Sequence, residues 1–175
     1  MAITYDKIAT VTVTGATAAN IEFTSIPQTY TDLLLKVSLR DSRTDAPVTD
    51  TLVTFNNSTS GYSVRGVYSD GSTADDIVSL SRTDLAGTYE NTSQSGNNSV
   101  FSNAEYYIAN YTTSNTKPVI IDGVTEKNGA TNIYMSLITG VWVNSSAITS
   151  IKLAPMFSLL FVTNSTATLY GIKNS

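Results

Sequence analysis

The acidic side chains are the residues of this chain whose chemistry could support a metal site. Two groups stand close together in sequence: Asp41, Asp45 and Asp50 in "DSRTDAPVTD", and Asp70, Asp75 and Asp76 in "SDGSTADD". Calcium takes six to eight oxygen ligands, and loops rich in aspartate can supply them. Neither spacing matches the calcium loop of helix–loop–helix proteins, and most acidic turns are solvated turn formers. We therefore expect no bound metal, with calcium as the alternative.

A pair of carboxyl groups could also hydrolyse a glycan if their separation were fixed in a cleft and one pKa were raised. Glu105 and Glu126 are the candidate pair of catalytic carboxyl groups. The chain has no histidine and no cysteine. Their absence excludes Ser–His–Asp and His–metal mechanisms, thiolate nucleophiles and disulfides. We expect no enzymatic activity and no cofactor.

The composition favours a protein that forms stable contacts with other proteins. Charged residues make up 14% of the chain, against roughly 25% in typical soluble domains, while Thr, Ser and Asn number 27, 22 and 14. A surface of hydroxyls and amides has little electrostatic self-repulsion and suits static contacts. The net charge is −4 and the largest basic cluster is the pair Arg40 and Arg43, so we expect no nucleic-acid partner.

The same scan predicts no membrane partner. No window approaches 18 consecutive apolar residues, the length that a membrane-spanning helix needs. The first residues, "MAITYDKIATVTV", lack the basic start and apolar run of a signal peptide. We therefore expect synthesis in a cytoplasm.

The elements that must position these side chains have a period of two residues, which indicates β-strands. We expect strands at 8–13, 20–26, 32–40, 51–56, 62–69, 77–82, 100–111, 118–126, 131–143, 147–154 and 166–172. Residues 84–98 are poor in apolar side chains and predict a long loop. Helix signals are close to absent, so the fold class is all-β with antiparallel strands.

About ten alternating strands would each expose an apolar face unless two sheets packed together. We therefore expect one domain, 1–175, folded as a two-sheet antiparallel sandwich. A jelly-roll-like order is the first choice and an immunoglobulin-like sandwich the second. In residues 32–40, Lys36, Ser38 and Arg40 should form an outer surface. The residues expected to face inward are Leu33, Leu35, Val37 and Leu39, packed against Ile133, Met135, Leu137 and Val141.

Several stretches resemble β-rich structural proteins of the virions of tailed bacteriophages. They are "IEFTSIPQTYTDLLLKVSLRDS" at 21–42, "VTFNNSTSGYSVRGVYSDGS" at 53–72, "SNAEYYIANY" at 102–111 and "AITSIKLAP…FVTNSTATLYGIK" at 147–173. The resemblance implies a virion protein made in the bacterial cytoplasm, such as a capsid decoration (cement) protein bound to the major capsid protein or to neighbouring virion proteins. Such proteins often form trimers and have no enzymatic activity. The alternative is a tail fibre or spike module that binds host surface glycan.

Two sets of side chains are candidates for contacts. The apolar run of Met156, Phe157, Leu159, Leu160, Phe161 and Val162 has no polar face, so it is either buried where the sandwich closes or shared between subunits of a homo-oligomer, with a trimer favoured. Aromatic side chains could form an exposed surface for a protein or a glycan: Tyr106, Tyr107, Tyr111, Tyr134 and Trp142. Tyr106 and Tyr107 are adjacent on a strand and must point to opposite faces.

Overall fold

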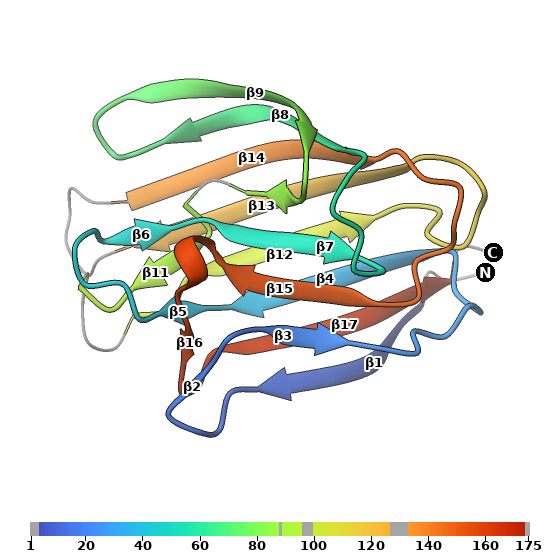
Figure 1. Ribbon diagram of the computed structural model, residues 1–175, viewed down its shortest axis with the longest axis horizontal. Coiled ribbons are helices and arrows are strands. Elements are labelled where there is room, and N and C mark those ends of the chain that lie inside the picture. Colours follow the sequence, from blue (N-terminus) through green and yellow to red (C-terminus); the bar gives the residue numbers. More distant parts are fainter. Residues whose placement is uncertain (1–3, 88, 96–99, 127–132, 174–175) are drawn as a thin grey trace.

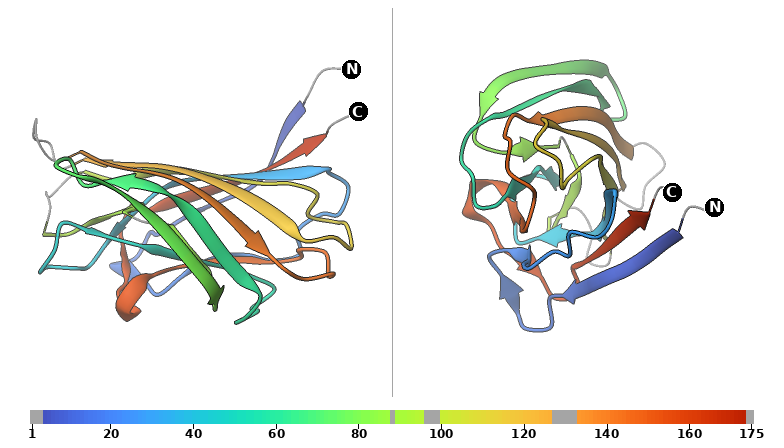
Figure 2. Two further views of the ribbon diagram at one scale, coloured as in Figure 1. Left: turned by 90° about the horizontal axis from the view of Figure 1, so that it is seen from above. Right: turned by 90° about the vertical axis from the view of Figure 1, so that its right-hand side faces the viewer.

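The computed structural model describes the whole chain except residues 1–3, 88, 96–99, 127–132 and 174–175. Two layers of β-strands lie face to face, with the hydrophobic core between them (Figures 1 and 2). The predicted all-β sandwich is therefore confirmed. The described part of the chain contains no α-helix. It therefore contains no helix that is long and apolar enough to span a membrane.

One layer is a single eight-stranded sheet in which all neighbours are antiparallel. Its strands, from one edge to the other, are β1 (Thr4–Thr12), β17 (Thr166–Lys173), β4 (Asp32–Ser38), β12 (Asn103–Ile108), β13 (Lys117–Glu126), β14 (Ile133–Trp142), β8 (Tyr62–Ser69) and β9 (Ala74–Arg82). We call this layer the large sheet.

The second layer consists of two smaller sheets, on the near side in Figure 1. One contains β10 (Leu85–Ala86), β7 (Thr51–Phe55), β15 (Ile151–Pro155) and β3 (Ile21–Phe23). The other contains β2 (Thr17–Ala18), β16 (Phe161–Val162), β5 (Arg40–Asp41), β11 (Asn91–Ser93) and β6 (Val48–Thr49). A single 3₁₀ turn, η1 (Met156–Ser158), joins β15 to β16.

The core forms because one side of each strand is apolar and packs between the layers. Leu33, Leu35, Val37 and Leu39 are at most 5% exposed, which confirms their predicted inward direction. At one end of the core, Trp142 stacks on Tyr62 with ring centroids 6.0 Å apart and meets Phe55 edge to face at 5.6 Å.

The predicted partners of these leucines are wrong. Because β4 and β14 belong to the same sheet, their side chains cannot face each other across the core. The inward residues of β14 are Ser136, Ile138, Gly140 and Trp142. Ile133, Met135 and Leu137 instead point away from the core and are 51–55% exposed, and Val141 is half-buried. Alternation shows that a strand has two faces, but both faces of β14 carry apolar side chains, and most of the aliphatic ones lie on the outer face.

Two further expectations are corrected by the second layer. Residues 84–98 contain the short strands β10 and β11, and β11 pairs with β5 and β6 through buried polar residues that carry no apolar signal. Lys36 is exposed and Ser38 half-buried, as an outer surface requires, but Arg40 is only 8% exposed. Arg40 differs because β4 ends at Ser38 and the chain then passes into the second layer as β5.

Candidate functional site

The outer face of the large sheet, which the second layer does not cover, carries an unusual number of exposed hydrophobic side chains. On β13, β14, β8 and β9 seven of them are between 44% and 59% exposed: Ile120, Val124, Ile133, Met135, Leu137, Val67 and Val78. We call this set the apolar outer face. Monomeric proteins rarely expose contiguous apolar patches of this kind, and such patches mark interaction sites.

Strand pairing makes the apolar outer face contiguous. Val124 lies opposite Met135 on the neighbouring strand, and Leu137 lies opposite Val67. Fully burying one such side chain contributes about 1.5–3 kcal/mol, so covering the exposed half of each would contribute about 1 kcal/mol. Seven side chains together offer several kcal/mol to any partner that covers them.

Two opposite charges lie within this patch. Arg65 on β8 is exposed and lies between Thr139 and Val78 on the neighbouring strands, while Asp122 on β13 is exposed beside Leu137. No ion pair joins either residue to another described residue. Both charges are therefore available to a partner.

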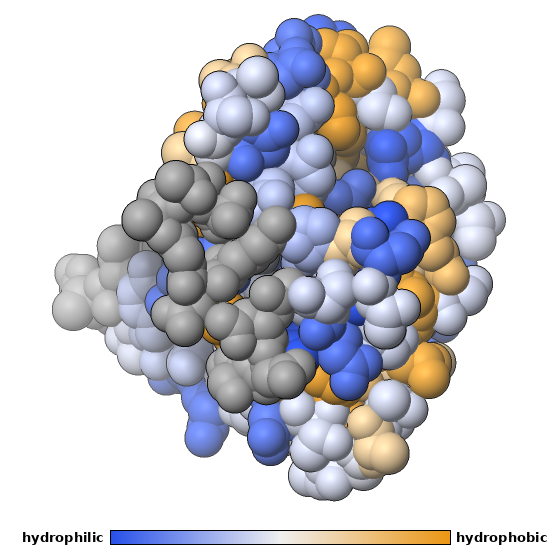
Figure 3. Space-filling view, turned by 90° about the vertical axis from the view of Figure 1, so that its left-hand side faces the viewer, coloured by the Kyte–Doolittle hydropathy of each residue, from blue (hydrophilic) through white to orange (hydrophobic). Residues whose placement is uncertain are grey.

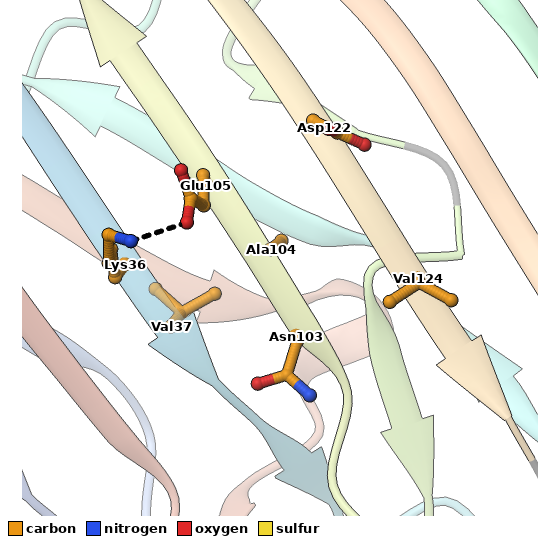
Figure 4. A pocket seen from close by; sticks show the side chains of 7 residues that line it. All are labelled: Lys36, Val37, Asn103, Ala104, Glu105, Asp122 and Val124. Carbon is orange, nitrogen blue, oxygen red and sulfur yellow. Dashed lines mark ion pairs between the residues drawn. The ribbon is translucent and has the colours of Figure 1, made fainter.

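The rest of the outer face, over β1, β17, β4 and β12, is more polar and slightly hollowed. Its centre is the ion pair between Lys36 Nζ and Glu105 Oε1, 2.6 Å apart, with side chains about half exposed (Figure 4). Hydrogen bonding to Glu105 raises the pKa of Lys36. Tyr5, Leu34 and Tyr170 line the depression beside this pair. An exposed ion pair of this kind is screened by water and contributes little stability.

Three of the five aromatic residues proposed as a contact surface are wrong for that role, and a fourth, Tyr134, is half-buried. Tyr106, Tyr111 and Trp142 are at most 1% exposed, because each points inward from its strand or loop into the core. Tyr107 alone reaches the outer face, where its hydroxyl donates to Asp32 Oδ2 at 2.6 Å. The predicted opposite directions of Tyr106 and Tyr107 are confirmed.

The apolar run that follows β15 forms a protruding turn. Phe157 in η1 is 68% exposed and has φ 60°, ψ 26°, and Ser158 also has a positive φ. The Arg43 guanidinium lies over the Phe157 ring, 5.3 Å from its centroid. Leu160 is 36% exposed, but Phe161 is fully buried in the core and cannot contact a partner. We call Met156, Phe157, Leu159 and Leu160 the η1 turn.

The η1 turn and the apolar outer face lie on opposite sides of the sandwich. In the left view of Figure 2, η1 projects from the layer of small sheets, away from the large sheet. Figure 3 shows several hydrophobic patches along the right-hand margin, the side of the small sheets, next to strongly hydrophilic ones. The chain thus offers apolar surface in two opposite directions.

A buried carboxyl group lies between the layers, and the sequence did not predict its burial. Glu90 is fully buried and its Oε2 accepts a hydrogen bond from the Tyr106 hydroxyl at 2.9 Å. Burial raises the pKa of Glu90 well above its usual value, and burial also raises the pKa values of Asp41 and Asp50. A glutamate between two turn-rich segments resembles any exposed acid, so no sequence signal marked it.

Three of the acidic side chains named in the sequence make local contacts within the protein. Asp41 is buried and accepts from Asn91, Asp45 binds Arg43, and Asp70 closes a turn by accepting from Ser72 and Thr73. Among the described residues no group of three or more acids is placed to hold a metal ion.

Comparison with protein-family models, with curated proteins and with solved structures found no match.

Proposed function

We propose that this protein is a structural component of a bacteriophage virion, most simply a capsid decoration or cement protein that bridges shell subunits. The observation that carries the proposal is the presence of apolar surface on both sides of the sandwich: the apolar outer face and the η1 turn. A protein that holds neighbours together needs contacts in more than one direction. The role is mechanical, because a shell cannot open without exposing these contacts again, and linked contacts raise the effective affinity far above that of one site.

The low charge content supports this role. With 14% charged residues, most of the surface can lie against another protein without a large cost of desolvating charges. A homo-oligomer on the particle is part of the proposal: the resemblance favours a trimer, whereas the apolar outer face favours a pair of copies.

The test is an add-back experiment with particles that lack this protein. We expect the purified chain to co-sediment with such particles in hundreds of copies and to raise the temperature at which they release DNA. Phe157→Ser should lower the number of bound copies, whereas Lys7→Ser, which removes a side chain at the far edge strand β1, should not. No binding, or binding without a change in release temperature, would contradict the cement role.

A second candidate function is glycan binding at the end of a tail fibre or spike. The specific observation is the depression on the outer face, where Tyr5, Tyr107 and Tyr170 surround the Lys36–Glu105 pair. Tyrosine rings stack on sugars and ion pairs can bind hydroxyls. About a dozen copies per purified particle together with hits on a glycan array would favour this candidate; hundreds of copies and an array without hits would exclude it.

A further inference from the structure

We propose that the apolar outer face pairs with the same face of a second copy of this chain, around a twofold axis that crosses β14. This inference names the partner of one of the two apolar surfaces and so rests on the proposed function. It leaves the η1 turns of the two copies pointing in opposite directions, where each can contact a different neighbouring virion protein.

The size of the patch fits a dimer contact. The four strands at about 4.8 Å spacing and the span from Ile133 to Val141 at about 3.4 Å per residue give a flat area of about 19 Å by 27 Å, or roughly 500 Å². Side-chain relief makes the accessible area larger than this flat value. It therefore approaches the roughly 800 Å² per partner that a standard protein interface buries.

The charges of the patch complement those of a second copy. The strand register places Arg65 beside Thr139 and Asp122 beside Leu137, on opposite sides of β14. The midpoint between the two charges therefore lies on β14, between Leu137 and Thr139. A twofold axis in the plane of the interface, through this point and perpendicular to the line that joins the two residues, brings Arg65 of each copy over Asp122 of the other. It also places Leu137 beside the axis. Self-complementarity of this kind is what a twofold interface requires.

The remaining charges of this surface flank the patch. Glu105 on β12 lies directly opposite Asp122 and is paired with Lys36. Asp76 is on the edge strand β9, and Glu126 is the last residue of β13. At the rim, water screens their repulsion. The central contacts are thus apolar side chains plus two Arg–Asp pairs for each dimer.

The edges of the large sheet favour contact through the face rather than strand-to-strand pairing. The edge strand β9 contains a register shift opposite Tyr62 and Val64, a positive φ at Ser81, and the charged pair Asp75 and Asp76. Bulges and charges on an edge strand are devices that prevent pairing with another strand. The apolar outer face beside β9 has, among its seven residues, no bulge or strand-end feature that would prevent contact with another protein.

Sedimentation velocity of the isolated chain over a range of concentrations tests the pairing. We expect a reversible equilibrium between monomer and dimer. Arg65→Asp and Asp122→Arg should each raise the dimer Kd about tenfold or more, because each change converts two attractive pairs into repulsive ones. The double variant should return to within about threefold of the original Kd, since the pairs form again with their signs exchanged.

Controls separate this contact from general effects. Lys152→Asp makes the same charge change as Arg65→Asp but on β15 in the second layer, and should leave the Kd unchanged. Leu137→Asp should abolish the dimer while circular dichroism shows a folded chain. A chain that stays monomeric at its highest soluble concentration, a trimer, or a double variant no better than the single ones would overturn the proposal. A monomer that still decorates particles would overturn the pairing alone, and a dimer that does not bind particles would overturn the proposed function alone.

Discussion

Glu90 should make the stability of this protein fall as the pH rises above 4.5, the ordinary pKa of its carboxyl group. Its carboxyl group is fully buried, with Oε2 bonded to Tyr106 and no described partner for Oε1. Burial raises its pKa well above the ordinary value of 4.5, so the folded protein binds this proton more tightly than the unfolded chain does. The contribution of Glu90 is therefore fully present below pH 4.5, and is lost as the pH rises from there towards the folded pKa.

The magnitude follows from the linkage between protonation and folding. A single group that is protonated in the folded state and ionised in the unfolded state lowers the free energy of unfolding by about 1.4 kcal/mol per pH unit. Asp41 and Asp50, whose pKa values burial also raises, add slope of the same sign. The chain has no histidine or cysteine, so few other groups titrate between pH 5 and 8 and obscure the effect.

The assay is urea unfolding at several pH values between 5 and 8, for the original chain and for Glu90→Gln. The amide oxygen of glutamine can still accept the Tyr106 hydroxyl, but the side chain does not ionise. The slope of the variant should therefore be shallower by up to about 1.4 kcal/mol per pH unit. Glu105→Gln makes the same chemical change at an exposed site and serves as the matched control. Equal slopes for the original chain and Glu90→Gln would refute the reasoning.

Three further predictions concern packing and backbone. Gly87→Ala should lower the free energy of unfolding in urea by about 1–3 kcal/mol, because an added Cβ would lie 1.3 Å from Glu90 Oε1. In a Glu90→Ala background the same substitution should lower it by less. An equal loss of stability in both backgrounds would contradict this contact. The fluorescence of Trp142, the only tryptophan and 1% exposed, should be blue-shifted and resistant to iodide; emission at the position of free tryptophan would show that the core is open. Phe157→Gly relieves roughly 1 kcal/mol of left-handed backbone strain and removes a cation–π contact with Arg43 of similar size. The temperature of thermal unfolding should therefore change little, while binding to particles falls. A large loss of stability would show that Phe157 serves the fold instead.

The sequence predicted most of the strands and the sandwich because both depend on local alternation and on the need to bury one face of each strand. The inward direction of Leu33, Leu35, Val37 and Leu39 followed from that pattern alone. The direction of β14 did not, because both of its faces carry apolar residues and the choice depends on the tertiary fit of Trp142 beside Phe55 and Tyr62.

The candidate site was predicted only in part for the same reason. The η1 turn was recognised by its lack of a polar face, but the division between exposed Phe157 and buried Phe161 depends on where β16 enters the second layer. The apolar outer face combines residues from four strands that lie far apart in sequence. Its contiguity comes from strand order and register, which alternation within one strand does not specify.

The most direct test of the bridging role uses two methionines, one on each apolar surface. Met135 belongs to the apolar outer face and Met156 to the η1 turn. Their oxidation rates can be compared by mass spectrometry, under hydroxyl-radical exposure, in dilute protein and in assembled particles. If the protein bridges neighbours through both surfaces, both methionines will oxidise more slowly in the particle. Unchanged rates for both in the particle would contradict the account.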